Sequence, residues 1–137
     1  METQRILLDT SIVIEFLRKK KKEKSVFFQL VPVYNLYASI ITQFEVEIGL
    51  KSEQHWLNYQ HVLQRMTILT VDRLCIDQAI TTYKYLKPRN QRIELADLLI
   101  GATALSHQLP IATLNTKHFT RIPHLQLVDL VSRRSSP

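Results

Sequence analysis

The sequence predicts one α/β domain in which helices cover both faces of a mostly parallel β-sheet. Short apolar runs rich in β-branched residues alternate with longer helical patterns along the 137-residue chain. Hydrophobic residues make up 45% of the chain and only 2 glycines and 5 prolines interrupt it, which excludes a disordered or low-complexity protein. We therefore expect a single domain over residues 1–131 and a frayed tail over residues 132–137.

The first two expected strands are each followed directly by a helix. The run at residues 5–9 predicts a strand, and Thr10 and Ser11 offer N-cap hydroxyls to the helix behind it. The run at residues 36–41 predicts the second strand, with Thr42 as the cap of the next helix. This repeated order is typical of a parallel sheet.

The rest of the chain continues the alternation of helices and strands. The pattern predicts a helix over Glu53–Arg65, a strand over 66–71, a helix over Arg73–Leu86 that Asp72 caps and Pro88 stops, a helix over 93–105 and a strand over 111–115. The helix over 93–105 is apolar around most of its circumference, so we expect it to be buried on several sides. An aspartate in that helix, Asp97, therefore needs a compensating charge.

Three acids from separate segments are expected at one end of the sheet. Asp9 ends the first strand, Glu45 lies in the first turn of the helix after the second strand, and Asp97 lies near the start of its helix. Because parallel sheets bind ligands beyond the carboxyl ends of their strands, these acids and Asn115 would face one crevice. Neighbouring carboxylates repel, and a hard divalent ion such as Mg²⁺ or Mn²⁺ relieves the repulsion. Such a site favours phosphodiester hydrolysis.

Each acid also has a purely structural interpretation. Asp9 is placed to cap a helix, Glu45 has the spacing of a T-x-x-E capping box, and Asp97 would complement the dipole of its helix. Glu94 either assists the site or solvates a helix start, and Glu15 is expected on the surface. The convergence of the three acids is what favours the cation site over these alternatives.

The charge balance favours an anionic partner. Lys and Arg number 18 against 12 Asp and Glu, which gives a net charge of +6. Much of the excess lies in one block, which is either a phosphate-binding segment or a solvated helix end: Arg18, Lys19, Lys20, Lys21 and Lys22. The single cysteine, the missing signal-peptide order and the absence of a run of about 18 apolar residues predict a cytoplasmic protein without a membrane span.

Four short motifs occur in the order found in PIN-domain ribonucleases. They are "LLDTSIVIEFLR", "SIITQFEVEIGL", "ELADLLIGATAL" and "IATLNTKHF", and the similarity extends from residue 6 to about residue 129. Within that family the sequence resembles the VapC-type toxins. The resemblance implies a three-layer α/β/α fold and an endoribonuclease that depends on Mg²⁺ or Mn²⁺.

The resemblance also assigns roles to individual residues. Asp9 matches the first acid of a D-T-[NS] motif, Glu45 the acid of E-x-x-x-G, and Asp97 the acid before a small-residue helix. These three are the predicted catalytic residues and metal ligands. The predicted accessory residues are Ser11, Glu94, Asn115 and His118, and Gly101 is expected to permit close helix packing.

The fourth motif departs from the family pattern. Family members usually carry another acid around "TLNTKHF", whereas this chain has Asn115 and, where an aspartate often precedes the phenylalanine, His118. An asparagine adds no charge, so we expect one tightly bound ion rather than two.

The resemblance implies three partners. They are RNA as the substrate, a small antitoxin that docks along the groove and supplies an arginine near the acids, and a second copy of the chain in a homodimer. The basic block at residues 18–24 would guide the RNA backbone towards Asp9. The alternative is a catalytically weak or inactive RNA-binding domain of the same fold, and a DNA-directed nuclease is a third hypothesis.

Overall fold

The sheet that organises the chain has four strands in the order β3-β2-β1-β4, and every pairing is parallel. The computed structural model describes residues 3–130. Its strands are β1 (Arg5–Leu8), β2 (Asn35–Ser39), β3 (Met66–Leu69) and β4 (Ile111–Ala112). A β-bridge from Ile111 to Leu127 lies at the β4 edge. The predicted parallel sheet is thus confirmed.

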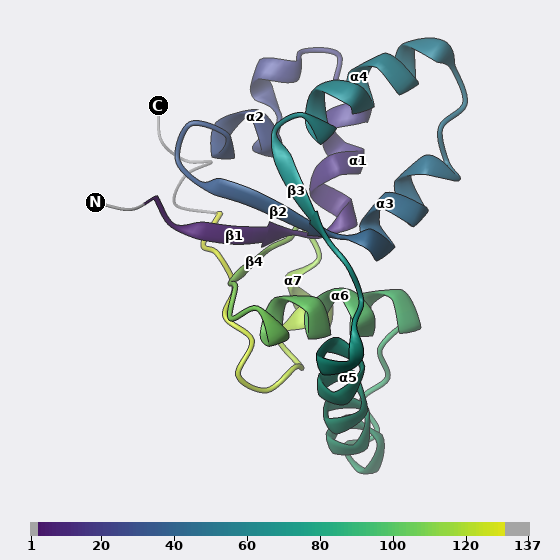
Figure 1. Ribbon diagram of the computed structural model, residues 1–137, viewed down its shortest axis with the longest axis vertical. Helices are drawn as coiled ribbons and strands as arrows, with labels where there is room; N and C mark the ends of the chain where they lie inside the picture. The colour runs from purple at the N-terminus through teal and green to yellow at the C-terminus, as the bar shows by residue number, and fades with distance from the viewer. Residues whose placement is uncertain (1–2, 131–137) are drawn as a thin grey trace.

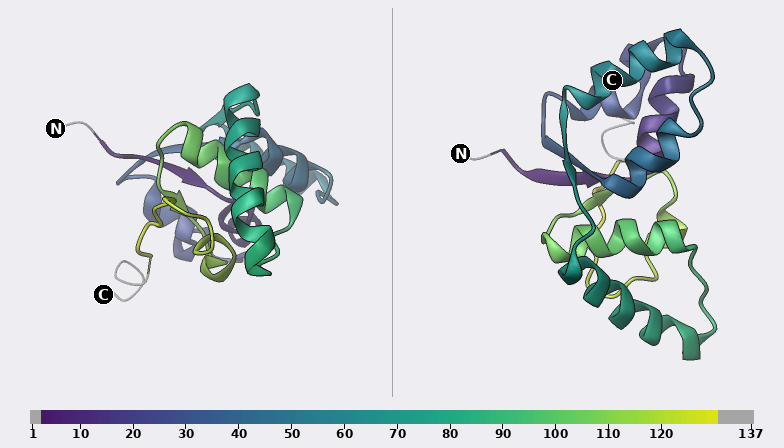
Figure 2. Two further views of the ribbon diagram at one scale, coloured as in Figure 1. Left: turned by 90° about the horizontal axis from the view of Figure 1, so that it is seen from below. Right: turned by 45° about the vertical axis from the view of Figure 1, so that its right-hand side comes forward.

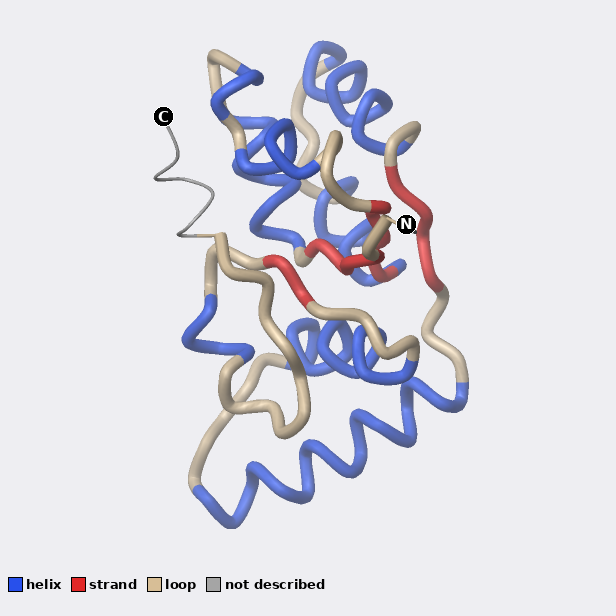
Figure 3. Tube along the Cα trace, turned by 90° about the vertical axis from the view of Figure 1, so that its left-hand side faces the viewer, coloured by secondary structure: helices blue, strands red, loops and turns tan. Residues whose placement is uncertain are grey.

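Helices cover both faces of this sheet. They are α1 (Thr10–Arg18), α2 (Val26–Leu30), α3 (Ile40–Glu47), α4 (Glu53–Leu63), α5 (Arg73–Leu86), α6 (Leu95–Ser106) and α7 (Thr116–Phe119), with 3₁₀ turns η1 (Lys22–Lys24) and η2 (Lys87–Arg89). Figure 1 shows α1, α2 and α4 on one side of the strands and α5, α6 and α7 on the other. The trace in Figure 3 shows the short strands between these two helical layers. The predicted α/β/α layering is therefore confirmed.

Alternating side chains of β1 join two separate hydrophobic clusters. Ile6 and Leu8 pack in the cluster that includes Tyr59 of α4, whereas Leu7 packs in the cluster that includes Ile100 of α6. Because strand side chains point to opposite faces in turn, one fully buried strand connects both layers. Each of these buried aliphatic side chains stabilises the fold by roughly 1.5–3 kcal/mol. Because β1 packs in both clusters, the position of Asp9, the residue that follows β1, is fixed by the helical layers on both faces of the sheet.

Several predicted bounds of helices and strands after residue 65 agree with the structure. The helix over Arg73–Leu86 is found as α5 with those bounds, and Asp72 caps it by accepting a 3.0 Å hydrogen bond from the Cys75 N–H. Pro88 lies in η2, directly after this helix. The predicted segments 66–71, 93–105 and 111–115 correspond to β3, α6 and β4. β3 ends two residues earlier than predicted, α6 is shifted by one or two residues, and β4 ends three residues earlier.

The predicted caps of the first two sheet-bound helices are wrong. Thr10 and Ser11 lie inside α1, and their hydroxyls bond to Glu45 and Asp9 instead of to helix N–H groups. The second strand ends at Ser39, not at residue 41, and Ser39 caps α3 by accepting from the Ile41 N–H at 3.1 Å. Several hydroxyl side chains lie near each strand end, and tertiary contacts decide which of them caps the helix.

Two short helices were not predicted. α2 follows η1 and is capped by Ser25, which accepts from the Phe28 N–H at 3.2 Å, and α7 lies after β4. Figure 2 shows the long α5 lying against α6 on the side away from the strands.

No helix within residues 3–130 is both long enough and apolar enough to cross a membrane. The predicted tail at 132–137 lies outside the described residues.

Candidate active site

One pocket brings the three predicted acids together. It is lined by Asp9, Thr10, Ser11, Ile14, Glu15, Arg18, Lys19, Glu45, Asp97, Leu114 and Asn115. The acids come from the end of β1, from α3 and from the first turn of α6. Figure 1 shows these elements meeting where β1 and β2 end, between the two helical layers. The pocket therefore lies beyond the carboxyl ends of parallel strands, where the sequence placed it.

Asp9 is a buried carboxylate at the floor of this pocket. Only 2% of the residue is exposed, and its two oxygens accept hydrogen bonds from Ser11 Oγ at 2.5 Å and Thr113 Oγ1 at 2.7 Å. Burial raises the pKa of Asp9 from its ordinary value of 3.8 to about 6, the two hydroxyls oppose that shift, and the charge of Asp97 adds to it. Asp9 is thus an anion whose charge the surrounding side chains only partly compensate.

Glu45 is held in place by a side chain from the neighbouring helix. Thr10 Oγ1 donates to Glu45 Oε1 at 2.6 Å and lies 3.0 Å from Thr42 Oγ1. Because α3 begins at Ile40, Glu45 is in its second turn, so both the first-turn placement and the T-x-x-E capping box are wrong. The capping interpretation of Glu45 is thereby removed, and its carboxylate is available to the pocket.

Asp97 faces the pocket from the first turn of α6. Its Oδ2 lies 3.0 Å from His118 Nδ1, and 21% of the Asp97 side chain is exposed. The position also suits the helix dipole, which favours a negative charge in the first turn. The structural interpretation and the pocket interpretation of Asp97 are therefore compatible with one another.

The chemistry of the donors fits a hard divalent cation. Three carboxylates, the Asn115 amide and the Ser11 hydroxyl line one pocket, and these are the oxygen donors that Mg²⁺ and Mn²⁺ prefer. Burial is the main cause of the raised pKa of Asp9 and the charge of Asp97 adds to it, and a cation beside the carboxylate would oppose both effects. Within residues 3–130, no three acidic, histidine or cysteine side chains are already gathered around a single point. The hydroxyls of Thr10, Ser11 and Thr113 hold the Asp9 and Glu45 oxygens in their present directions.

The basic block divides into pocket residues and a structural residue. Arg18 and Lys19 line the pocket beside the acids. Lys22 instead donates to the carbonyls of Phe16 and Leu17, at 2.6 and 2.9 Å, and desolvation lowers its pKa. Lys22 thus satisfies carbonyls at the C-terminal end of α1, and we remove it from the predicted phosphate-binding set, since two of its three N–H donors are engaged there.

The structure corrects the expectation for Glu15, adds Thr113 as a residue that contacts Asp9, and places Glu94 away from the pocket. Glu15, expected on the surface, is half-buried at the pocket and accepts the Val26 N–H at 2.7 Å, so it anchors the start of α2. Thr113 was not predicted, although its place at the end of β4 next to β1 is the same criterion that selected Asn115. Glu94 is exposed at the N-cap of α6, outside the set of pocket-lining residues.

Ser11 and Asn115 connect the pocket to β4. Ser11 Oγ donates to Asp9 and accepts the Leu114 N–H at 3.0 Å, so one hydroxyl joins the starts of α1 and of the segment after β4. The Asn115 N–H donates to Thr113 Oγ1 at 2.9 Å, which leaves the exposed Asn115 amide at the pocket. The predicted accessory position of both residues at the pocket is therefore found in the structure.

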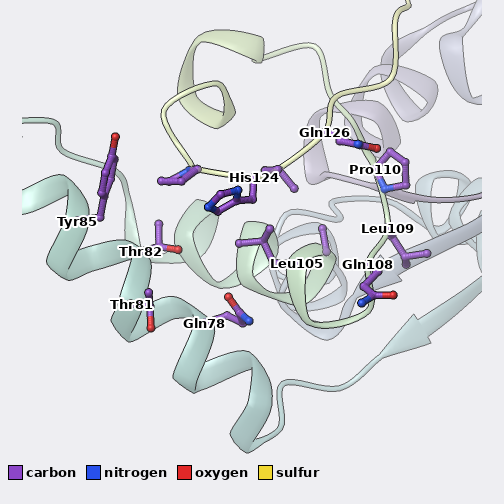
Figure 4. A pocket seen from close by; sticks show the side chains of 13 residues that line it. Gln78, Thr81, Thr82, Tyr85, Leu105, Gln108, Leu109, Pro110, His124 and Gln126 are labelled. Carbon is purple, nitrogen blue, oxygen red and sulfur yellow. The ribbon is translucent and has the colours of Figure 1, made fainter.

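A second cavity, of about 560 Å³, lies at the opposite end of α6. Figure 4 shows that its walls carry polar side chains such as Gln78, Thr82, Tyr85, His124 and Gln126. None of the residues that line it within the described chain is an Asp or a Glu. The chemistry of a divalent cation therefore belongs to the first pocket.

The comparisons with known proteins agree with this fold and pocket. The sequence matches the model of the PIN domain over residues 6–125, and the chain belongs to the PIN-domain family. A ribonuclease VapC from Rickettsia bellii is 33% identical over 135 residues, which cover 91% of this chain and 96% of that protein. Within the PIN-domain family, the chain is thus a member of the VapC type.

Two further comparisons extend this finding. Ribonuclease VapC1 from Methanocaldococcus jannaschii is 29% identical over 126 residues, which cover 92% of this chain and 87% of that one. The solved structure of VapBC-1 from nontypeable Haemophilus influenzae superposes with a TM-score of 0.77 at 28% identity and covers 93% of this chain and 99% of that chain. The similarity therefore extends over nearly the whole molecule.

Proposed function

We propose that the protein is a metal-dependent endoribonuclease that hydrolyses RNA phosphodiester bonds as the toxin of a toxin–antitoxin pair. The observation that carries this proposal is the pocket in which Asp9, Glu45 and Asp97, from three separate segments, lie beside Arg18 and Lys19. Acids that gather in one pocket favour a divalent cation, and basic side chains at its rim favour a phosphate backbone. The relatives named VapC are ribonucleases by name, which supports the same activity here.

Each pocket residue has a role in this reaction. Asp9, Glu45 and Asp97 would hold a Mg²⁺ or Mn²⁺ ion, which would supply an activated water and charge neutralisation at the scissile phosphate. Thr10, Ser11 and Thr113 orient the Glu45 and Asp9 carboxylates through hydroxyl donors. Arg18 and Lys19 position the RNA backbone by charge. Asn115 contributes a neutral oxygen, consistent with one tightly held ion.

We also propose two protein partners. Solved neighbours support an antitoxin partner, since they include a toxin-antitoxin complex from Klebsiella pneumoniae and FitAB bound to a DNA fragment. A second copy of the chain would cover an apolar surface on α5 and α6, where Ile76, Ile80, Tyr83 and Leu95 are between 40% and 69% exposed. Single exposed apolar residues are common on protein surfaces, whereas a group of them on one surface is typical of an interaction site. We place the protein in the cytoplasm because its lone Cys75 is buried and free.

The test is cleavage of purified total RNA by the wild type, Asp97→Asn and Asp77→Asn, with Mg²⁺, Mn²⁺ or a chelator. Asp77 is an exposed acid on α5 and serves as the matched control. Discrete products from the wild type and Asp77→Asn, lost with Asp97→Asn and with the chelator, are expected. Circular dichroism checks that all three proteins are folded. Intact RNA in every reaction of a folded wild type contradicts the proposal.

The alternative is an RNA-binding domain with weak or no cleavage, which the replacement of a fourth acid by Asn115 and His118 favours. It predicts that the wild type retains RNA in a filter-binding assay without forming products in either metal. A labelled DNA of the same sequence, tested in parallel, separates an RNA-directed from a DNA-directed nuclease.

A further inference from the structure

The second cavity is a concave site that the proposed cleavage reaction does not use. It lies between α5, the end of α6 and residues 123–126, and its volume of about 560 Å³ is typical of pockets that bind small organic groups. Leu105 and Leu109 give it an apolar wall, and polar side chains surround the rest (Figure 4). No Asp, Glu, Lys or Arg of the described chain lines it, so the cavity suits an uncharged ligand group.

Thr82 presents a buried hydroxyl to this cavity. Only 4% of the residue is exposed, and its side chain makes no hydrogen bond within residues 3–130. Every fully enclosed side-chain nitrogen or oxygen in that range has a partner, so the hydroxyl of Thr82 must open onto the cavity. Figure 4 shows its oxygen directed towards the middle of the cavity. A buried polar group normally has a hydrogen-bond partner, and a ligand in the cavity would supply one.

Gln108 occupies a backbone position at which glycine is usual. α6 ends in a Schellman motif, in which the Leu109 N–H donates to the Ala104 carbonyl at 2.9 Å. Gln108, at the left-handed position of that motif, has a φ of 56°, which glycine adopts without strain. His124, with a φ of 68°, is a second left-handed residue that lines the cavity. Such strain is often found at functional sites, and here it accompanies two polar side chains at one cavity.

The polar groups around the cavity match the edge of a nucleobase. Three side-chain amides that both donate and accept line it, and none of them is hydrogen-bonded within the described residues: Gln78, Gln108 and Gln126. A nucleobase has neighbouring donors and acceptors along one planar edge, and glutamine pairs with adenine through them. The Arg89 guanidinium lies 3.7 Å over the ring of Tyr85, which lines the cavity. An aromatic ring beside a cation is typical of sites that bind single-stranded nucleic acid.

We infer that this cavity binds one unpaired nucleobase of the RNA, apart from the bond that is cleaved, and so contributes to the choice of cleavage site. The inference rests on the proposed function, because the strand that enters the first pocket supplies the base. Asp97 and Leu105 lie about 12 Å apart along α6, so a strand of a few nucleotides would reach both sites. The segment from α7, which the buried Phe119 anchors, to His124 joins the two sites and carries Arg121 as a cation for the RNA backbone.

Titration of the four nucleoside 5′-monophosphates into ¹⁵N-labelled protein with a chelator tests the cavity itself. We expect at least one of them to shift the NMR signals of Leu109 and His124, whereas ribose 5-phosphate, which lacks a base, should not. Thr82→Val should weaken that binding by about fivefold, because it removes one hydrogen bond and keeps the shape. No shift at the cavity with any of the four nucleotides overturns the inference.

Two further variants keep the test independent of the buried position. Gln78→Ala changes an exposed residue of the cavity wall and should also weaken nucleotide binding without affecting the fold. Thr67→Val, at an exposed position of β3 outside the cavity, is the matched control and should bind as the wild type does. Equal affinities for the wild type, Thr82→Val and Gln78→Ala also overturn the inference.

A short RNA distinguishes a base of the substrate from a free nucleotide. With a chelator present, Thr82→Val and Gln78→Ala should weaken the binding of a labelled single-stranded hexanucleotide, and with metal they should change the cleavage positions in total RNA. If both stay unchanged while mononucleotide binding falls, the role in RNA recognition is overturned and the cavity is a site for a free nucleotide. If the folded wild type binds a mononucleotide there but leaves RNA intact with Mg²⁺ and Mn²⁺, the proposed function fails instead.

Discussion

Replacing Asp9 by asparagine should stabilise the ion-free protein at neutral pH. The folded protein raises the pKa of Asp9 from 3.8 to about 6, chiefly because the carboxyl is buried. A tenfold change in proton affinity corresponds to about 1.4 kcal/mol, so ionised Asp9 costs the fold about 3 kcal/mol. An asparagine has nearly the same shape and carries no charge. The buried charge of Asp9 thus lowers the free energy of unfolding of the ion-free protein, as strongly perturbed acids at functional sites often do.

The sign of this effect depends on pH in a defined way. Below about pH 4 the carboxyl is protonated in both folded and unfolded chains, and the cost is absent. Between about pH 4 and pH 6 the folded state binds more protons, so the stability that this group contributes falls as the pH rises. Above pH 6 the full cost is present. Asp9→Asn should therefore gain the full stability at pH 7.5 and only a small fraction of it at pH 4.

Urea denaturation with a chelator, followed by circular dichroism at both pH values, measures this gain. We expect Asp9→Asn to be about 2–3 kcal/mol more stable than the wild type at pH 7.5, after allowing up to about 1 kcal/mol for altered hydrogen bonds to Ser11 and Thr113. Asp77→Asn, at an exposed site, should change little at either pH. An Asp9→Asn protein no more stable at pH 7.5, or equally stabilised at pH 4, refutes the reasoning.

Four other substitutions separate the roles assigned above. Lys22→Ala should lower the free energy of unfolding by about 1 kcal/mol and leave RNA affinity nearly unchanged, whereas Lys19→Ala should weaken RNA binding and flatten its salt dependence, both read by denaturation and filter binding. Thr10→Val should reduce RNA cleavage with an unchanged circular dichroism spectrum, because Glu45 loses its 2.6 Å donor; full activity would show that this contact is dispensable. Ile80→Lys should give a monomer in analytical ultracentrifugation, and a persistent dimer would place the interface elsewhere.

Local patterns predicted the elements whose signals lie within a few residues. Asp72 directly precedes the helical pattern and caps α5, and Leu86 is the last residue of α5 because Pro88 follows. The three acids could be placed at one pocket because β1 and β2 are parallel and buried, so their ends share an edge. Sequence reasoning was reliable where one local rule acted alone.

Long-range contacts decided what local patterns left open. Ser39 and Thr42 both offered a hydroxyl near the start of α3, and only the packing of the strand against its neighbours ends β2 at Ser39. Thr10 was expected to cap a helix because its partner, Glu45, lies 35 residues away in sequence. Lys22 looked like its exposed neighbours in the basic block until its bonds to the end of α1 were seen. These side chains satisfy polar groups that no local rule identifies.

The hydrogen bond between Asp9 and Thr113 joins residues 104 positions apart, and it exists only when β4 has paired with β1. A ribosome adds residues in order, so a growing chain has Asp9 and Glu45 long before it has Asp97, β4 and the Phe119 anchor of α7. The acids cannot be assembled until nearly all of the chain has emerged. Under the proposed function, an unfinished chain would therefore lack the assembled pocket needed to cleave RNA, and the proposed antitoxin would have that interval in which to fold.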